Sequence, residues 1–277
     1  MAIVTLTTDI GNQDYLVGAV KGKLFQANKQ FNITDITHHL SPFNYPQAAY
    51  VARHAIENFP PGSFHLVLVN LFDNKPDHML LAYHNDQYIA CADNGLLTMI
   101  LEDEPQLVVA LPLENFRQRN TLYCTEVIAK AFQELIEGKE FKSVGKPVDI
   151  QVKRSFKPKL GADYIEGHII FIDHFENVVV NITREDFESQ RMQRSFRIIF
   201  KRDEVIEKIS ESYADVAEGE KLAFFNSAGY LEIAINKGNA AGLLGLQRFS
   251  ERQNQYAQQP FSQKNLFYQT VKILFGD

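Results

Sequence analysis

The first half of the chain alternates short apolar segments with longer amphipathic ones, and this pattern limits the possible folds more than any other feature. Strands are predicted at residues 2–8, 31–37 and 63–70, and helices at residues 14–27 and 46–59. The third strand, "SFHLVLVN", is an almost continuous apolar run, which is typical of a parallel strand buried on both faces. The repeated β-α-β order predicts a largely parallel sheet with helices packed on its faces.

Two further segments complete this half of the chain. Residues 79–98 ("MLLAYHNDQYIACADNGLLT") have the pattern of a hairpin that leads into a helix. Residues 124–138 ("CTEVIAKAFQELIEG") have the apolar spacing of an amphipathic helix. We therefore expect an α/β domain over residues 1–155.

The pattern changes near Lys146. Residues 146–167 carry several turn signals and an excess of basic side chains, as a connection between domains does. Short β-like segments follow, separated by Gly, Asn or Asp: "GHIIFID", "NVVVNIT", "SFRIIFK", "KLAFFNS", "YLEIAIN" and "LFYQTVKILF". This spacing is typical of a small barrel or sandwich. We expect a smaller all-β, barrel-like domain over residues 156–277.

The composition narrows the classes of partner. The 277 residues are 45% apolar and 22% charged, with a net charge of −6. The negative charge and the lack of a Lys/Arg cluster argue against a nucleic-acid partner, and no apolar run approaches the ~18 residues of a membrane span. The first residues predict a strand and not a signal peptide, and two cysteines do not make a disulfide framework. We expect a cytoplasmic protein that binds neither nucleic acid nor membrane.

Few residues suggest chemistry on their own. His38 and His39 are adjacent on a predicted strand, so their side chains point to opposite faces and are not expected to share a metal ion. Asp9 ends the first strand, where it either caps the next helix or binds a ligand at the carboxyl edge of the sheet. Asp93 and Asn94 also fit a helix cap.

Five motifs occur in order along the chain: "LTTDIGNQDYLVGAVKG", "DITHHLSPF", "ADNGLLT", "IDHFENVVVNIT" and "NSAGYLEIAINKGNAA". Turn and cap chemistry explains most of them when each is taken alone. Together they resemble the S-adenosylmethionine hydroxide adenosyltransferase family, which also includes the fluorinases and chlorinases. The resemblance spans residues 3–245.

The resemblance implies a fold, an assembly and a reaction. Family members have an N-terminal α/β domain and a C-terminal β-barrel, and they form homotrimers with the ligand held between subunits. The reaction is displacement at ribose C5′ of S-adenosylmethionine by a nucleophile, with methionine leaving. The sulfonium is already a good leaving group, so this chemistry requires alignment and desolvation of the nucleophile and no cofactor.

The resemblance also assigns ligand-binding roles. Asp9 matches the acid that accepts hydrogen bonds from both ribose hydroxyls, a task suited to the two oxygens of a carboxylate. Phe43 matches an aromatic residue near the ribose, and Asp173 matches the acid that pairs with the ligand's ammonium group. The other candidate ligand-binding residues are Asn94, Cys124, Phe175, Asn177, Asn226 and Ser227.

The expected catalytic set is replaced. Hydrolytic members carry an Asp-Arg-His set that activates water, whereas the matching positions here are Asn70, Asp77 and Tyr123. Asn70 cannot act as a base, and a tyrosine with an ordinary pKa near 10 is a poor base at neutral pH. Asp73, Asp77 and His78 are candidate substitutes for the missing base.

Three hypotheses follow from this mixture. The first is an enzyme that transfers the adenosyl group to water or another nucleophile from a reorganised site. The second is a sensor that binds S-adenosylmethionine or adenosine without turnover, and the third is a structural trimer with a relict pocket. Halogenating members also have a tyrosine at the position of Tyr123, but Asp73 or Asp77 would repel a halide that shared the pocket.

Overall fold

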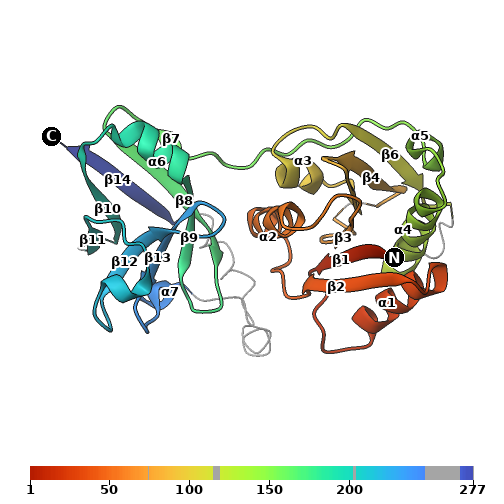
Figure 1. Cartoon of the computed structure of the whole chain (residues 1–277), viewed down its shortest axis with the longest axis horizontal. Coiled ribbons are helices and arrows are strands. Elements are labelled where there is room, and N and C mark those ends of the chain that lie inside the picture. The colour runs from red at the N-terminus through yellow and green to blue at the C-terminus, as the bar shows by residue number, and fades with distance from the viewer. Residues whose placement is uncertain (74, 115–118, 202–203, 247–268, 277) are drawn as a thin grey trace. The chain divides into compact units, whose positions relative to one another are not determined.

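The chain divides into two compact units, Met1–Ser155 and Phe156–Asp277 (Figure 1). The structure is a computed structural model that describes residues 1–73, 75–114, 119–201, 204–246 and 269–276. Each unit has a hydrophobic core of its own.

The first unit is an α/β domain built on a six-stranded sheet with the order β2-β1-β3-β5-β4-β6. Its strands are β1 (Ala2–Thr8), β2 (Phe31–Thr37), β3 (Phe64–Leu68), β4 (His78–His84), β5 (Gln87–Ala92) and β6 (Leu107–Pro112). Strands β2, β1, β3 and β5 are parallel, and β4 pairs antiparallel with both β5 and β6. The prediction of a largely parallel sheet is confirmed, and β4 and β5 form the predicted hairpin.

Helices cover both faces of this sheet (Figure 1). The helices are α1 (Leu16–Ala27), α2 (Tyr45–Glu57), α3 (Leu96–Leu101), α4 (Thr121–Ile136) and α5 (Phe141–Val144). Side chains of α1 and α4 enter the core on one face, and side chains of α2 and α3 enter the core on the other. Strand β3 serves both cores because successive side chains point to opposite faces, which explains its continuous apolar sequence.

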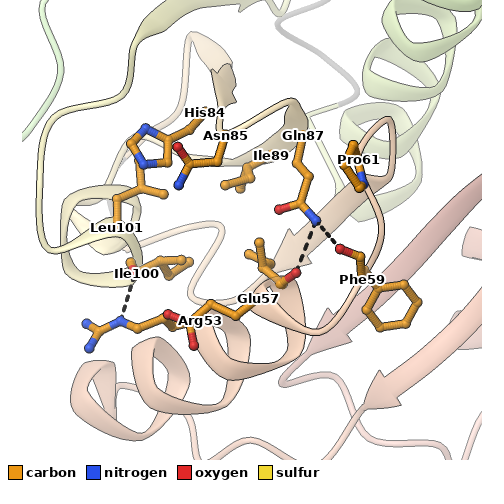
Figure 2. Close-up of a pocket in the computed structure, with 11 residues that line it drawn as sticks. Arg53, Glu57, Phe59, Pro61, His84, Asn85, Gln87, Ile89, Ile100 and Leu101 are labelled. Atoms are coloured by element: carbon orange, nitrogen blue, oxygen red, sulfur yellow. Dashed lines mark hydrogen bonds between the residues drawn. The ribbon is translucent and has the colours of Figure 1, made fainter.

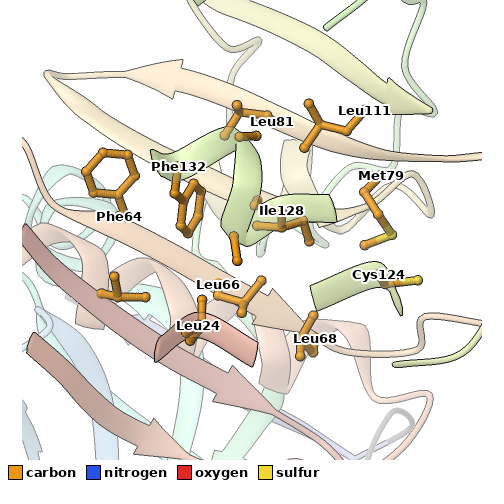
Figure 3. Close-up of a cluster of buried hydrophobic side chains, with 14 of the residues drawn as sticks. Leu24, Phe64, Leu66, Leu68, Met79, Leu81, Leu111, Cys124, Ile128 and Phe132 are labelled. Carbon is orange, nitrogen blue, oxygen red and sulfur yellow. The ribbon is translucent and has the colours of Figure 1, made fainter. Parts of the chain in front are cut away.

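Figure 3 shows the larger of these two cores, where Leu66 and Leu68 of β3 lie beside Ile128 and Phe132 of α4. All four side chains are almost completely buried. Burial of a large aliphatic or aromatic side chain contributes about 1.5–3 kcal/mol. This packing fixes the parallel strands, so their carboxyl ends meet at one edge of the sheet.

The second unit is a nearly closed, barrel-like sheet with the order β11-β10-β14-β8-β9-β13-β12, and β7 pairs with β8. Its strands are β7 (Lys159–Leu160), β8 (Tyr164–Ile172), β9 (Val178–Thr183), β10 (Ser195–Lys201), β11 (Glu204–Ile206), β12 (Lys221–Phe225), β13 (Tyr230–Ile235) and β14 (Thr270–Gly276). A parallel bridge between Ile209, just after β11, and Ala223 of β12 links the two edges. The barrel-like fold predicted for this region is confirmed.

The second unit also contains short helices: α6 (Arg184–Arg191), the 3-10 helix η1 (Tyr213–Asp215) and α7 (Ala240–Leu243). A capping box between Thr183 and Asp186 begins α6, whose only buried side chain is Phe187. A single buried residue gives no helical periodicity, so the sequence pattern did not predict this helix.

Candidate functional site

Asp9 lies directly after β1, at the carboxyl edge of the parallel strands. Its carboxylate is partly buried, and Oδ2 accepts a hydrogen bond of 2.9 Å from the backbone N–H of Asn70, just beyond the end of β3. Burial raises the pKa of Asp9, and the hydrogen bond from Asn70 opposes that rise. Asp9 is therefore a carboxylate held at a sheet edge where ligands commonly bind in α/β proteins.

Asn70 connects several of the predicted site residues. Its backbone is left-handed, with φ of 49°, a conformation that asparagine adopts more readily than most residues. Its side-chain Oδ1 accepts a hydrogen bond of 2.8 Å from the N–H of Phe43, a residue that is 65% exposed. Asn94 Nδ2 donates to the carbonyls of Val69 and Asn70 at 3.1 and 3.2 Å. The structure thus joins Asp9, Phe43, Asn70 and Asn94 into one hydrogen-bonded group.

Asp73 belongs to the same group and also contacts Tyr45, a residue that the sequence did not indicate. Its N–H donates to the carbonyl of Asn70 at 3.3 Å, and its Oδ2 accepts a hydrogen bond of 2.9 Å from the hydroxyl of Tyr45. Burial, followed by the contact with Asp73, raises the pKa of Tyr45. The ammonium of Lys153 lies 3.8 Å from the centre of the Tyr45 ring.

Asp77 and His78 form a second pair at the same edge, because β4 begins there. Asp77 Oδ1 lies 2.5 Å from His78 Nδ1, and His78 Nε2 lies 3.5 Å from Asp93 Oδ2. The contact with His78 lowers the pKa of Asp77. The side chain of Asp77 is 75% exposed, so this carboxylate points largely into solvent.

Tyr123 and Cys124 lie in the first turn of α4, where Asn120 Oδ1 accepts a hydrogen bond from the N–H of Tyr123 at 3.0 Å. Tyr123 is partly buried against the core, and Cys124 is completely buried (Figure 3). Burial raises the pKa of the Cys124 thiol to about 11. Cys124 therefore contributes a neutral, apolar side chain that faces the core cluster of this domain.

The second unit holds the remaining candidates in two turns. In the first turn, residues 173–177, Asp173 Oδ1 accepts hydrogen bonds from the N–H groups of Phe175 and Asn177 at 2.9 and 2.8 Å. Asp173 Oδ2 accepts a further one from Asn177 Nδ2 at 3.0 Å. Phe175 is 71% exposed in this turn, whereas Asn177 is buried.

The second turn, residues 226–230, is organised by Asn226. Its Oδ1 accepts hydrogen bonds from the N–H groups of Ala228 and Tyr230 at 3.0 and 3.1 Å, and Ser227 is exposed at the tip. Asn226 Nδ2 donates to Glu232 Oε2 at 3.1 Å. Glu232 is only 6% exposed.

Tyr213 joins this group of the second unit, because its hydroxyl donates to Glu232 Oε1 at 3.2 Å. Five residues in these groups were not predicted as site residues: Tyr45, Asp93, Lys153, Tyr213 and Glu232. The one available signal was Glu232, a single acid within the apolar strand "YLEIAI". Tyr45 and Tyr213 meet their partners only through contacts between distant segments, which no local pattern reveals. Lys153 likewise reaches Tyr45 from the carboxyl-terminal end of the first unit, far along the chain from Tyr45.

A separate cavity of about 300 Å³ lies near the start of β5 and the end of α2 (Figure 2). Its polar side chains mainly hold helix ends: Arg53 donates to the carbonyls of Met99 and Ile100, and Gln87 donates to those of Ile56 and Phe59. These are structural contacts, so we do not place the functional site there.

His38 is buried and lies 3.0 Å from Thr8 Oγ1 through Nδ1 and 3.2 Å from Asp35 Oδ1 through Nε2. His39 is exposed. Within the described ranges, no group of three His, Cys, Asp or Glu side chains is arranged to hold a metal ion. None of the helices in the described part of the chain has the length and apolar character needed to cross a membrane.

Comparison with known proteins agrees with this architecture. The chain is 28% identical over 259 residues to an (R)-S-adenosyl-L-methionine hydrolase of Methanocaldococcus jannaschii. The aligned region covers 90% of this chain and 94% of the relative. The chain is 23% identical over 275 residues to a fluorinase of Actinopolyspora mzabensis, with coverage of 86% and 92%.

A solved structure of an uncharacterized conserved protein from Thermotoga maritima superposes with a TM-score of 0.79 and 26% identity, covering 98% of this chain and 99% of the other. Models of the SAM hydroxide adenosyltransferase N-terminal and C-terminal domains match residues 4–145 and 167–253. Because these matches cover most of its length, the chain belongs to the SAM hydroxide adenosyltransferase family.

Proposed function

We propose that this protein displaces methionine from S-adenosylmethionine by attack of water or hydroxide on ribose C5′, giving adenosine and methionine. The new bond joins oxygen to C5′, and the C5′–S bond breaks with its electron pair going to sulfur. When water is the nucleophile, one of its protons is released. The names of the relatives support this reaction class, and the hydrolase names specify the (R) epimer of the sulfonium.

The observation that carries the proposal is the placement of Asp9. Its carboxylate stands at the carboxyl edge of β1, held through Oδ2 by the N–H of Asn70. A carboxylate fixed in this way suits a vicinal diol, because its two oxygens can accept hydrogen bonds from both ribose hydroxyls. Phe43 is hydrogen-bonded to the same residue, Asn70, and its exposed side chain supplies an apolar surface for the nucleoside.

A specific observation also favours the second candidate, a sensor that binds the nucleoside without turnover. Asn70 holds the position of the family's catalytic acid, and its side chain is engaged with the N–H of Phe43. Asp73, Asp77 and His78 remain the candidate bases, and each is within hydrogen-bonding distance of another side chain. A positioned base usually contributes about 10²–10⁴-fold in rate, so its loss would leave binding without appreciable chemistry.

One experiment separates the two candidates. The full-length protein is incubated with each sulfonium epimer of S-adenosylmethionine, release of adenosine and methionine is followed by chromatography, and binding is measured by calorimetry. Enzymatic release of both products in equal amounts supports the hydrolase, whereas binding without release supports the sensor. No binding of S-adenosylmethionine or adenosine at millimolar concentration would contradict both.

The proposal includes a cytoplasmic homotrimer whose ligand sites lie between subunits. Light scattering of the full-length protein tests the oligomeric state. A monomer that still binds nucleoside would contradict this assembly.

A further inference from the structure

Glu232 links the two turns that carry the ligand-binding candidates of the second unit. It lies on β13, where it pairs with Val179 of β9 and Phe224 of β12. Its Oε1 accepts a hydrogen bond of 3.0 Å from Asn177 Nδ2 in the first turn. Its Oε2 accepts one of 3.1 Å from Asn226 Nδ2 in the second turn. One carboxylate therefore contacts both turns, with one oxygen for each.

Tyr213 of η1 completes the network. Its hydroxyl donates to Glu232 Oε1 at 3.2 Å and accepts a hydrogen bond from Asn177 Nδ2 at 2.8 Å. The Tyr213 ring packs edge-on against Phe224. Burial and the neighbouring Glu232 charge raise the pKa of Tyr213 to about 12, so its hydroxyl keeps the proton that it donates.

The network determines how the two amides are oriented. A carboxylate only accepts hydrogen bonds, so each Asn side chain must turn its Nδ2 toward Glu232. The Oδ1 of Asn226 then faces the N–H groups of Ala228 and Tyr230, and these bonds shape the second turn. The same constraint turns Asn177 Nδ2 toward Asp173 Oδ2 in the first turn.

A buried carboxylate in this position is costly. Glu232 is 6% exposed, and no ion pair with it is found among the described residues. Burial raises its pKa, while the hydrogen bond from Asn226 opposes that rise. Burial of an ionised group without an opposite charge disfavours folding. Stability therefore does not account for an acid at this position, whereas control of amide orientation does.

We propose that Glu232 is a positioning residue for ligand binding, which acts through Asn177 and Asn226 to hold the 173–177 and 226–230 turns in the geometry that presents Phe175 and Ser227 to the ligand. The inference rests on the proposed function, because it concerns the same ligand. Glu232 acts through the two asparagines and is not itself expected to contact the reacting atoms.

The test uses one isosteric change and one rescue. Glu232→Gln keeps the volume but turns one acceptor into a donor, so an amide faces an amide at Asn226 or at Asn177. The double variant Glu232→Gln with Asn226→Asp exchanges donor and acceptor, and it restores both the hydrogen bond and the local charge. Glu218→Gln is the matched control, because Glu218 pairs with Lys237 on the exposed surface of the same unit.

KM and kcat for S-adenosylmethionine, the Kd for adenosine and the melting temperature are measured for the full-length proteins. We expect Glu232→Gln to raise KM and Kd by about tenfold, as for the loss of a charge-assisted hydrogen bond, with kcat little changed. The double variant should recover most of this loss, and Glu218→Gln should match the wild type.

Other outcomes overturn the inference. Unchanged KM and Kd in Glu232→Gln show that the network does not position the ligand. A loss of kcat and melting temperature at constant KM, or no recovery in the double variant, shows a role in folding alone. If the wild type binds adenosine but has no turnover, the Kd measurements alone decide whether Glu232 positions the ligand. If the wild type binds neither compound, the proposed function fails and this inference fails with it.

Discussion

Asp9 and Asp173 are both acids at the start of a loop, but the protein uses their carboxylates differently. Asp9 is held by a hydrogen bond from the N–H of Asn70, 61 residues away, and its pKa is raised by burial. Asp173 accepts three hydrogen bonds from residues two and four positions later in its own turn. Local contacts satisfy Asp173 within its turn, whereas burial removes water from Asp9 and no comparable set of donors surrounds it among the described residues.

This difference indicates separate tasks. A carboxylate that is desolvated and only partly compensated gains most from new donors, such as the hydroxyls of a ligand. A carboxylate satisfied by its own turn mainly fixes the shape of that turn. We therefore expect Asp9 to contribute directly to affinity, and Asp173 to contribute both through its charge and through the placement of Phe175 and Asn177.

The largest expected effect is that of Asp9→Ala. Loss of its contacts with the nucleoside should weaken binding of adenosine and S-adenosylmethionine by about tenfold or more, because a hydrogen bond to a charged group contributes about 1.5–3 kcal/mol. Calorimetry with both ligands measures this change. Asp14→Asn is a suitable control. Asp14 lies in the loop between β1 and α1, where it accepts a hydrogen bond from the N–H of Leu16. Equal affinities for Asp9→Ala and wild type would rule out the ribose contact.

Asp173→Ala tests the other half of the comparison. Loosening of the turn should weaken adenosine binding several-fold, and S-adenosylmethionine should lose more because it alone carries the ammonium group. The ratio of the two affinities is the informative measurement. Equal losses for both ligands would mean that Asp173 serves its turn only and does not pair with the ammonium.

Asn70→Asp probes the position where the family's catalytic acid is expected. The new carboxylate can still accept the N–H of Phe43, but it adds a negative charge beside Asp9, so nucleoside binding should weaken a few-fold. Adenosine release should not rise, because residues that act as a unit are non-additive. The smallest set of substitutions that we expect to raise adenosine release is the triple variant Asn70→Asp, Asp77→Arg and Tyr123→His. A clear gain from Asn70→Asp alone would show that the missing acid was the sole defect.

The sequence predicted the fold far better than the connections within the site. The apolar run of β3 and the hairpin of β4 and β5 follow from local patterns, and the position of Asp9 follows from the parallel order of the strands. The role of Asn70 did not follow from the sequence. In the sequence, Asn70 at the position expected for an acid indicated only that a catalytic base is missing. The structure shows that Asn70 is hydrogen-bonded to both Asp9 and Phe43. Those contacts join segments that are 61 and 27 residues apart, so no local pattern contains them.

The smallest expected effect concerns the stability cost of Asp9. Its pKa is raised in the folded protein, so its contribution to stability is greatest below the unfolded pKa, near 3.8, and is lost as the pH rises through the folded value. Asp9→Asn keeps an oxygen for the N–H of Asn70 and removes this ionisation. The variant should therefore be more stable than the wild type at pH 7, and the difference should shrink toward zero below pH 4. Urea unfolding at the two pH values measures the difference. A variant that is less stable at pH 7 would show that the ionised carboxylate stabilises the fold, and Asp9 would then have a structural role.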